Sequence, residues 1–473
     1  METVVGILNT VFWNYILVYG LLAVGVYFTI RLGFVQFRHF GELFRVIVGS
    51  RRTDAAGISP FQALTVSLAS RVGVGNLAGV AVALYLGGAG AIFWMWLVAL
   101  VGMATAYAES TLGQMYKTTN TDGEYRGGPA FYIARGLNSH WAAVIFSIAL
   151  MISFGLVFNA VQANAIAGAM ENAFSVPTWL TGILLAAVAG IVIFGGIRSV
   201  ARVASHVVPI MALVYVLVAL LVLVMNITEV PGMLAAIVLS AFGFQEAAGG
   251  VAGGMAAAML NGIKRGMFSN EAGMGSVPNI AACATPRPHH PSSQGFVQAL
   301  GVFIDTIVIC TATALVILLS GVFEPGTGAT GIELTQNALE DHLGPIGPYF
   351  IALAILFFAF TSIIGNYSYA ENALTYMGLA GRTGITVLRS ALLLMVIWGS
   401  LQTVDTVFNT ADASMGLMAT INLVAIVLLS GTVAKLTRDY FKQRSEGKEP
   451  RFRIDAYPEL EQKIDTSIWH GRD

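Results

Sequence analysis

The sequence predicts an all-helical protein that crosses a membrane many times. Of its 473 residues, 56% are hydrophobic, 52 are glycine and 11% are charged, whereas roughly 25% of the residues of a typical soluble protein are charged. So few charges cannot cover the surface of a water-soluble enzyme of this length, and so many apolar residues exclude a disordered chain. Apolar runs of bilayer-spanning length recur along the chain, which indicates a polytopic membrane protein.

Charge, cysteine content and missing motifs exclude further classes. A net charge of −1 leaves no basic face for nucleic acid, so we expect no nucleic-acid partner. Cys283 and Cys310 are too few for a disulfide framework or a cysteine metal site. The sequence contains no Gly-x-x-x-x-Gly-Lys-Ser/Thr phosphate loop and no nucleophile elbow. We therefore expect neither an ATP-driven motor nor an enzyme.

Eleven apolar runs of spanning length are the candidate transmembrane helices. About 20 helical residues cross the roughly 30 Å of hydrocarbon in a bilayer. The runs lie at about 13–32, 61–86, 89–116, 140–170, 176–195, 203–225, 250–285, 295–320, 346–378, 384–400 and 405–431.

The basic residues predict how these spans are oriented. If residues 1–12 lie outside and the spans alternate, 22 of the 25 Lys and Arg residues fall in cytoplasmic segments. This is the distribution that the positive-inside rule requires. The exceptions are Arg71, Lys264 and Arg265, which lie inside candidate spans. We expect a multi-pass protein of the cell inner (plasma) membrane, with its N-terminus outside and its C-terminus in the cytoplasm.

The ten spans after the first fall into two sets of five. Spans that begin near 89, 140, 176 and 203 have counterparts 202–208 residues later, near 295, 346, 384 and 405. Because five is odd, the two sets enter the membrane from opposite sides, as in the inverted repeats of many secondary transporters. The predicted parts are an extra N-terminal helix with its loop (1–57), a first repeat (58–228), an outer interfacial segment with the second repeat (229–434), and a cytoplasmic tail (435–473).

Glycine pairs interrupt the first span of each repeat. Ser70–Asn76 and Asn270–Ser276 both contain Gly-x-Gly, each with an ionised residue two positions before the first glycine. Glycines with polar neighbours are poor helix formers, so both segments predict a broken helix. Paired breaks in two halves are a good pointer to the binding site of a transporter.

The second break has two possible registers. The repeat favours a break at 268–276, which makes 231–243 an outer interfacial or re-entrant segment that does not span. It also places Lys264 and Arg265 within a span, where we expect them to line a water-filled vestibule, since a lipid-facing charge costs about 2.5–3.5 kcal/mol. The competing register puts the break within 231–262, around Gly243–Gly250, and leaves both cations at the cytoplasmic edge.

The free backbone groups of a broken helix are candidate ligands. The N–H groups around Gly73–Asn76 suit a carboxylate, and the carbonyls of Ala69 and Val72 suit a small cation.

Four polar side chains within apolar runs have two interpretations each. Gln162 and Asn164 either contact a ligand or form helix–helix hydrogen bonds. Thr361 and Ser362 either help to bind a cation or bond back to their own helix.

Several acids and one arginine lie within the spans. Arg71 and Glu271 are equivalent in the repeat and opposite in sign, so we hypothesise an ion pair between the two breaks. We expect Glu109, Asp305 and Glu371 to support helix ends, with a proton-binding role left open.

Seven segments together resemble the family of alanine or glycine:cation symporters. They cover about residues 60–380, and the string Phe268–Ser276 is highly specific. The segments are Gly73–Ala81, Phe93–Trp96, Gly102–Ala104 with Ala108–Glu109, Gly127–Ala130, Gln162–Ala165, Arg265–Ser276 and Ala359–Ser362. The resemblance implies sodium-coupled uptake of small amino acids. It also implies the five-plus-five inverted-repeat, leucine-transporter-like fold, preceded by one extra helix.

The resemblance further implies roles for single residues in substrate binding. Asn76 and Gln162 would bind the substrate carboxylate beside the broken-helix N–H groups of Gly73, Val74 and Gly75. Phe268 would cap a small side-chain pocket.

The resemblance also implies a cation site and one departure. Thr361 and Ser362, with the carbonyls of Ala69 and Val72, would form the sodium site common to this fold. Some relatives have an aromatic residue at the position of Asn366, so an amide there would enlarge or polarise the pocket and leaves strict alanine or glycine specificity open.

The sequence thus predicts a sodium-driven symporter for alanine, glycine or a similarly small amino acid. Its partners would be the substrate, sodium as the coupling ion and the bilayer, with no other cofactor, and we expect a monomer. The alternatives are a proton-coupled transporter of the same fold and a channel.

Overall fold

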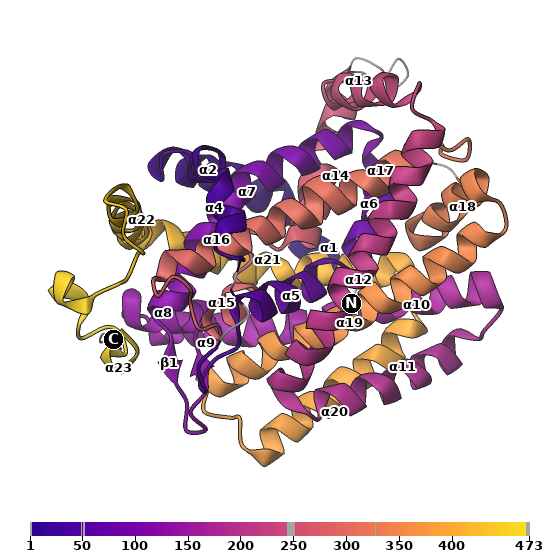
Figure 1. Ribbon diagram of the computed structural model, residues 1–473. Helices are drawn as coiled ribbons and strands as arrows, with labels where there is room; N and C mark the ends of the chain where they lie inside the picture. Colours follow the sequence, from indigo (N-terminus) through magenta and orange to yellow (C-terminus); the bar gives the residue numbers. More distant parts are fainter. Residues whose placement is uncertain (1, 49, 51–52, 244–250, 327, 470–473) are drawn as a thin grey trace.

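The computed structural model describes residues 2–48, 50, 53–243, 251–326 and 328–469. Over these ranges the chain is a bundle of helices, and the one sheet found there is a ribbon of two antiparallel strands, β1 (Thr118–Thr119) and β2 (Tyr125–Arg126) (Figure 1). The prediction of an all-helical polytopic membrane protein is confirmed.

The elements follow the predicted order. The N-terminal part contains α1 (Glu2–Asn9), η1 (Thr10–Leu17), α2 (Val18–Arg31), α3 (Val35–Arg38) and α4 (Phe40–Arg45). The first set of core helices consists of α5 (Pro60–Arg71), η2 (Gly75–Gly79), α6 (Val80–Gly87), α7 (Gly90–Met115), α8 (Pro129–Gly136), α9 (His140–Leu150), η3 (Met151–Val157), α10 (Phe158–Phe174), α11 (Thr178–Ile193) and α12 (Gly196–Met225).

The second half of the chain continues in the same way. It contains α13 (Val230–Ala241), α14 (Val251–Asn270), α15 (Pro278–Ala282), α16 (Pro291–Val302), η4 (Phe303–Cys310), α17 (Thr311–Leu318), α18 (Gly331–Leu343), α19 (Ile346–Tyr376), α20 (Arg382–Ser400) and α21 (Val404–Leu428). The tail contains α22 (Ser430–Ser445), η5 (Ile454–Ala456), η6 (Pro458–Leu460) and α23 (Thr466–Trp469).

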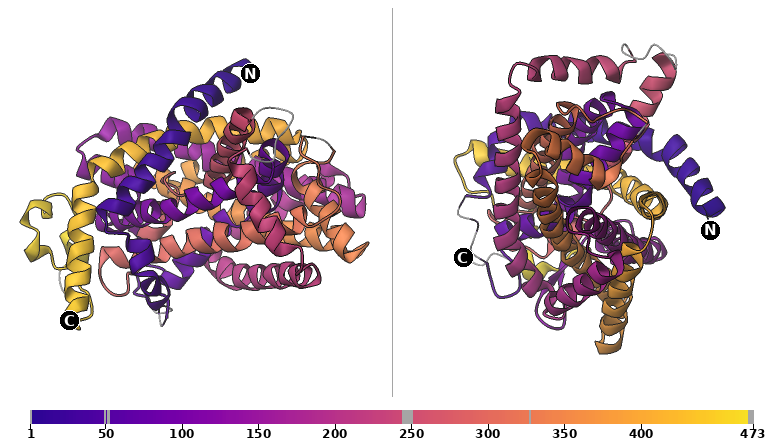
Figure 2. Two further views of the ribbon diagram at one scale, coloured as in Figure 1. Left: turned by 90° about the horizontal axis from the view of Figure 1, so that it is seen from above. Right: turned by 90° about the vertical axis from the view of Figure 1, so that its right-hand side faces the viewer.

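The helices match the eleven predicted spans. Among the described residues, eight helices are long and apolar enough to cross a membrane, and the bent pair of α5 with η2 and α6 raises that number to nine. The other two predicted spans correspond to α11, which has 16 residues, and to α14, which has 20 and carries Lys264 and Arg265 in its second half. The tail helix α22 lies across one end of the bundle (Figure 2). We call this end, which also carries α8 and the β-ribbon, the tail end, and the opposite end the α18 end (Figure 1).

Helices that are equivalent in the repeat pack directly against each other. Contacts join α7 to α16, α10 to α19, and α11 to α20. Each pair consists of one helix from each predicted repeat. Two repeats related by an axis within the membrane plane bring such helices together in the middle of the molecule.

The first break lies where the sequence predicts it. Ser59 and Gln62 form a reciprocal capping box at the start of α5, with Pro60 at the first helical position. The helix ends at Arg71 and resumes at Gly75 after a bend of 50°. The intervening segment therefore leaves backbone groups free of helical hydrogen bonds in the middle of the bundle.

The second break follows Asn270, in the register that the repeat favours. Glu271, Gly273 and Gly275 all have positive φ (56°, 87° and 79°) and the chain becomes helical again at Pro278. Three left-handed residues within five positions cannot continue a right-handed α-helix. The competing register centres on Gly243–Gly250, of which residues 244–250 lie outside the described residues.

The segment before this break is helical but does not span. α13 has 12 residues, which at a rise of 1.5 Å per residue gives about 18 Å, well short of the hydrocarbon thickness. It crosses the edge of the bundle in the right-hand view of Figure 2. Its location at the membrane interface stays a prediction.

The structure corrects the expectation that Lys264 and Arg265 line a water-filled vestibule. Both cations pair with Asp412 of α21, with 2.6 Å between Lys264 Nζ and Asp412 Oδ2. The side chain of Arg265 is only 3% exposed, and that of Asp412 only 1%. A shared buried carboxylate, rather than water, thus compensates the two charges and fixes α14 against α21.

We predict that Asp412→Asn destabilises the protein. The substitution leaves two buried cations without a counter-charge, a change that typically costs about 3–5 kcal/mol. Thermal unfolding of the purified protein in detergent would show a clearly lower melting temperature. Asp405→Asn is the matched control, because Asp405 is exposed in the first turn of the same helix. Equal melting temperatures for the two variants would contradict this account of the triad.

Candidate functional site

Side-chain amides satisfy the free N–H groups of the first break. Gln162 of α10 accepts a hydrogen bond from the backbone N–H of Val74 (3.1 Å), and Asn76 accepts one from Gly73 (2.9 Å). Both side chains are buried. The structure therefore brings together four of the residues predicted to bind a carboxylate, on the N–H side of the break.

Gly73 and Gly75 are needed for space rather than for an unusual conformation. A Cβ atom on Gly73 would lie 2.8 Å from Gln162 Oε1 and would collide with Ser362 Oγ. A Cβ atom on Gly75 would lie 2.9 Å from the Cα atom of Ser269 on α14. The break is thus packed tightly against α10, α19 and the other broken helix.

On the carbonyl side of the break, the structure joins two of the four predicted cation ligands. Ser362 of α19 donates to the carbonyl oxygen of Ala69 (2.8 Å) and also lies 3.1 Å from its own Phe358 carbonyl. Thr361 bonds back to Phe358 (2.9 Å), and the N–H of Val72 closes the last turn of α5 on Leu68. Uncharged hydroxyl and carbonyl oxygens are the donors that a hard cation prefers. The oxygens of Ala69 and Ser362 are donors of this kind, whereas the Thr361 hydroxyl is bonded to its own helix.

Phe268 lies in an aromatic stack beside the breaks. Its ring stacks on Phe158 (centroids 4.7 Å apart) and lies 5.4 Å from Phe408, and the guanidinium of Arg265 covers both Phe268 and Phe408. Stacked rings under a cation form a rigid apolar wall.

A cavity of about 200 Å³ opens from the α18 end and reaches this stack at Phe408. Asn164 also lines it, but the Asn164 amide donates to the carbonyls of Gly399 and Gln402. The helix–helix interpretation therefore accounts for the side-chain nitrogen of Asn164, whereas the side-chain oxygen of Gln162 accepts a hydrogen bond from Val74 at the break.

Sequence reasoning missed a buried cluster around Asp305 of η4. Its carboxylate accepts hydrogen bonds from Asn76 Nδ2 (2.7 Å), Ser269 Oγ (2.9 Å) and Thr306 Oγ1 (2.7 Å). Asn76 is therefore engaged at both ends of its amide. An acid inside an apolar run was the available signal, but the sequence did not show that its partners come from both breaks.

The predicted ion pair between Arg71 and Glu271 is wrong. No N–O contact of ion-pair length joins these two described side chains; Arg71 instead donates to the backbone carbonyl of Gln298 on α16 (3.1 Å). Gly301 leaves the room that this guanidinium occupies, because a Cβ there would collide with it. Glu271 is bound by hydroxyl groups, Ser70 Oγ at 2.7 Å and Ser276 Oγ at 2.5 Å.

Glu109 supports the second break, as predicted for an acid at a helix end. Its carboxylate accepts the N–H groups of Gly273 and Gly275 (3.2 Å each) and the Asn422 amide (2.7 Å). These are three donors to one buried acid, so α7 supplies the hydrogen bonds that the interrupted helix lacks.

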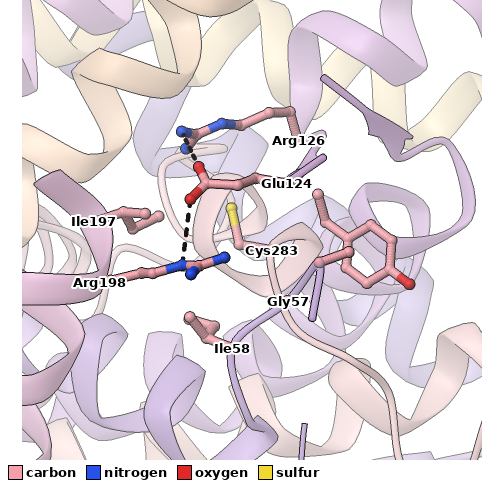
Figure 3. Close-up of a pocket in the computed structure, with 9 residues that line it drawn as sticks. Gly57, Ile58, Glu124, Arg126, Ile197, Arg198 and Cys283 are labelled. Carbon is pink, nitrogen blue, oxygen red and sulfur yellow. Dashed lines mark hydrogen bonds and ion pairs between the residues drawn. The ribbon is translucent and has the colours of Figure 1, made fainter. Parts of the chain in front are cut away.

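Glu371 belongs to an ion-pair cluster at the tail end. Arg126 of β2 contacts Glu371 (3.1 Å) and Glu124 (3.0 Å), and Glu124 also contacts Arg198 of α12 (3.3 Å), as Figure 3 shows for the last two pairs. The neighbouring Lys117 is buried and donates to the Ala284 carbonyl (2.9 Å). Burial lowers the pKa of this amine to about 7. Charged groups from α12, α19 and the β-ribbon thus meet at the tail end.

The chain is similar to known proteins over nearly its whole length. The model of the sodium:alanine symporter family matches residues 1–454. The chain is 48% identical to the amino-acid carrier protein AlsT of Bacillus subtilis (97% of this chain, 96% of the relative) and 45% identical to the probable sodium/glutamine symporter GlnT of the same organism (98% of each). It is 38% identical to the sodium/alanine symporter AgcS of Methanococcus maripaludis (93% and 97%).

A solved structure confirms the predicted leucine-transporter-like fold. The crystal structure of MhsT in complex with L-phenylalanine superposes with a TM-score of 0.55 over 80% of this chain and 93% of MhsT. At 16% identity this likeness shows the fold alone.

We predict that Gly73→Ala destabilises the break. Forcing a methyl group against Ser362 and Gln162 is overpacking, which costs about 1–3 kcal/mol. Gly79→Ala is the matched control on the same broken helix, because a Cβ there meets nothing closer than the Val74 carbonyl at 3.5 Å. Thermal unfolding would show a lower melting temperature for the Gly73 variant alone. If both variants unfold like the unchanged protein, the break is not packed as described.

Proposed function

The chain belongs to the sodium:alanine symporter family, and we propose that it imports a small neutral amino acid together with sodium by alternating access. Membership in a family of transporters implies transport rather than catalysis. The proposal goes further than the family in naming the ion, the substrate class and the residues that hold them.

The observation that carries the proposal is that both ends of one break face scaffold helices. The Val74 N–H points at Gln162 of α10, and the Ala69 carbonyl points at Ser362 of α19, five residues earlier in the chain. A carboxylate on the N–H side and a cation on the carbonyl side would therefore order the same short segment. Each ligand would then raise the affinity of the site for the other.

In the proposed cycle, sodium is held by the carbonyls of Ala69 and Val72 with the hydroxyls of Thr361 and Ser362. The substrate carboxylate binds at the N–H groups of Gly73, Val74 and Gly75, beside Gln162 and Asn76. Sodium would favour the outward-open state and order the break for the substrate. Transport requires that the ligands bind the two states with different affinity, because equal affinity shifts no equilibrium.

Phe268 is proposed to limit the size of the substrate side chain. Its stacking on Phe158 and the cation above it make the wall stiff. The amide of Asn366 is bound to Ser70 and Asn159, so we propose that it acts on the site through Ser70. Relatives are named for both alanine and glutamine, and a substrate panel should include both.

We propose that the α18 end faces the outside and the tail end faces the cytoplasm of the inner membrane. The basic residues of the Arg126 and Arg198 segments and of the tail lie at the tail end, where the positive-inside rule places them. The cavity that ends at Phe408 would then be the outer approach to the site. We propose a monomer as the working unit.

Reconstitution in liposomes tests the proposal. An inward sodium gradient is expected to drive uptake of labelled alanine, with competition by glycine, whereas matched potassium and proton gradients are not. Uptake that follows the proton gradient alone would replace sodium by protons in the proposal, and conductance without saturation by substrate would indicate a channel.

We predict that the double variant Thr361→Ala, Ser362→Ala loses sodium dependence. Removing two hydroxyl oxygens from a sodium site leaves too few ligands for tight binding, so uptake should fall at least about tenfold at limiting sodium. Thr375→Ala is the control, because this threonine lies on the same helix and bonds only to its own backbone. Unchanged sodium dependence in the double variant would remove these residues from the cation site.

We predict that Phe268→Ala widens the range of substrates. Removing the ring opens space beside the break, and a change of pocket size is worth about tenfold or more in discrimination. The ratio of glutamine to alanine uptake should rise accordingly. Phe357→Ala serves as the control, because this ring is exposed on the outer face of α19. An unchanged ratio would show that Phe268 does not line the substrate pocket.

A further inference from the structure

A chain of hydrogen bonds joins the two breaks, and one of its contacts needs a hydrogen atom whose source is not obvious. Ser70 Oγ lies 2.7 Å from Glu271 Oε1 and 2.6 Å from Asn366 Oδ1. Two oxygen atoms at such distances need a hydrogen atom between them. The serine hydroxyl has a single hydrogen, so it serves one of these two contacts and the other must obtain a hydrogen from its second partner.

Asn159 of α10 fixes the direction of the chain at its far end. The Asn159 amide nitrogen donates to the backbone carbonyls of Phe154 (2.7 Å) and Gly155 (3.1 Å). These carbonyls only accept, so the orientation of this amide follows from its partners. The Asn159 oxygen therefore points towards Asn366.

Asn366 is oriented in turn. Its nitrogen donates to Asn159 Oδ1 (3.1 Å), which leaves its oxygen facing Ser70. If the Asn366 amide were turned over, its oxygen would face the side-chain oxygen of Asn159, with no hydrogen between them. If Asn159 turned as well, its oxygen would face the Phe154 and Gly155 carbonyls, again with no hydrogen between them. Ser70 therefore gives its hydrogen to Asn366.

The remaining hydrogen has to come from Glu271. We propose that Glu271 is a proton-binding site: its carboxyl group carries a proton in this conformation and donates it to Ser70, which links the second broken helix to the first. Its other oxygen accepts from Ser276 (2.5 Å). The five side chains of this chain of hydrogen bonds are all buried, so bulk water cannot donate the hydrogen in place of Glu271. They are Asn159, Asn366, Ser70, Glu271 and Ser276.

No cation among the described residues forms an ion pair with Glu271. The charged and titratable groups that face it are Arg71 of α5, Asp305 of η4, Tyr369 of α19 and, across the break, Glu109 of α7. Arg71 directs its guanidinium to the Gln298 carbonyl and forms no ion pair with Glu271. Glu109 differs in kind, because its described partners are three N–H donors, which an ionised carboxylate satisfies without a proton.

Loss of the proton would weaken the link between the breaks. An ionised Glu271 would face Ser70 Oγ with no hydrogen between the two oxygens, and α5 would separate from the segment after α14 or the asparagines would have to turn. Since both breaks belong to the proposed transport site, we infer that proton release from Glu271 favours the conformation in which they part. This consequence for transport rests on the proposed function, whereas the protonation itself does not.

Infrared spectroscopy of the full-length protein in lipid tests the protonation directly. The unchanged protein should show the carbonyl band of a protonated carboxyl group, shifted in D₂O, that Glu271→Gln removes. Glu371→Gln is the matched control, because Glu371 contacts Arg126 in an ion pair and its replacement should leave the band in place. A band that survives in Glu271→Gln, or no such band in the unchanged protein at any pH, would overturn the proposal.

Asn159→Leu provides a second test that keeps Glu271. Without Asn159, the amide of Asn366 is free to turn and donate to Ser70, and Ser70 can then donate to an ionised Glu271. The band should therefore disappear at a lower pH than in the unchanged protein. The same midpoint in both would refute the argument from hydrogen-bond direction.

Uptake measured against pH separates this inference from the proposed function. Sodium-driven uptake should change about tenfold per pH unit above the midpoint of the band, and Glu271→Gln, whose amide donates and accepts like the neutral acid, should flatten that dependence. Sodium-driven uptake without the band would refute the proton site and leave the symporter. The band without sodium-driven uptake would refute the proposed function and leave the proton site.

Discussion

Two interrupted helices in a medium without water create the constraint on which this structure depends. Each break exposes backbone N–H and carbonyl groups, and each group left unpaired in an apolar interior costs several kcal/mol. The protein therefore supplies partners from side chains. Glu109 and Asn422 satisfy the second break, whereas Gln162 and Asn76 satisfy the first. Hydrogen bonds to neighbouring helices thus replace the backbone hydrogen bonds that a regular helix would form within itself. In the proposed transport site, a ligand could take the place of these partners.

The two breaks also complete each other. Gly75 allows the first broken helix to approach the backbone of Ser269 in the second, and Ser70 reaches Glu271 across the interface. Asp305 binds one residue from each break, Asn76 and Ser269. A displacement of one break would therefore change the hydrogen bonds of the other, because both breaks bond to the same buried groups. Direct packing of repeat-equivalent helices, such as α7 on α16 and α10 on α19, provides the scaffold against which such a displacement takes place.

The sequence predicted the positions of the helices and breaks far better than the partners of the buried charges. Span length, the positions of Lys and Arg, and glycine pairs depend on local composition, so they can be read without a structure. The pairing of Arg71 with Glu271 seemed to follow from their equivalence in the repeat, but the side chain of Arg71 leaves α5 towards α16, where Gly301 makes room for it. Likewise, nothing in the sequence near Lys264 and Arg265 indicates that their counter-ion is Asp412, almost 150 residues away. Direction of side chains and long-range partners are properties of the packed bundle.

The same distinction explains which parts of the site the sequence could predict. Residues that act through the backbone, such as Ala69, Gly73 and Val74, are identified by the break itself, because any break has an N–H side and a carbonyl side. Residues that act through side chains depend on which helix faces the break. In this conformation Gln162 and Ser362 contact the break directly. Asn164 instead contacts the Gly399 carbonyl, and Thr361 contacts only the Phe358 carbonyl of its own helix and would have to turn to bind the proposed sodium ion. A rotation of α10 or α19 by a fraction of a turn would exchange these roles. In the proposed site, selectivity would therefore depend on the orientation of the scaffold helices. Polar contacts such as those of Asn164 with the Gly399 and Gln402 carbonyls fix that orientation without facing the break.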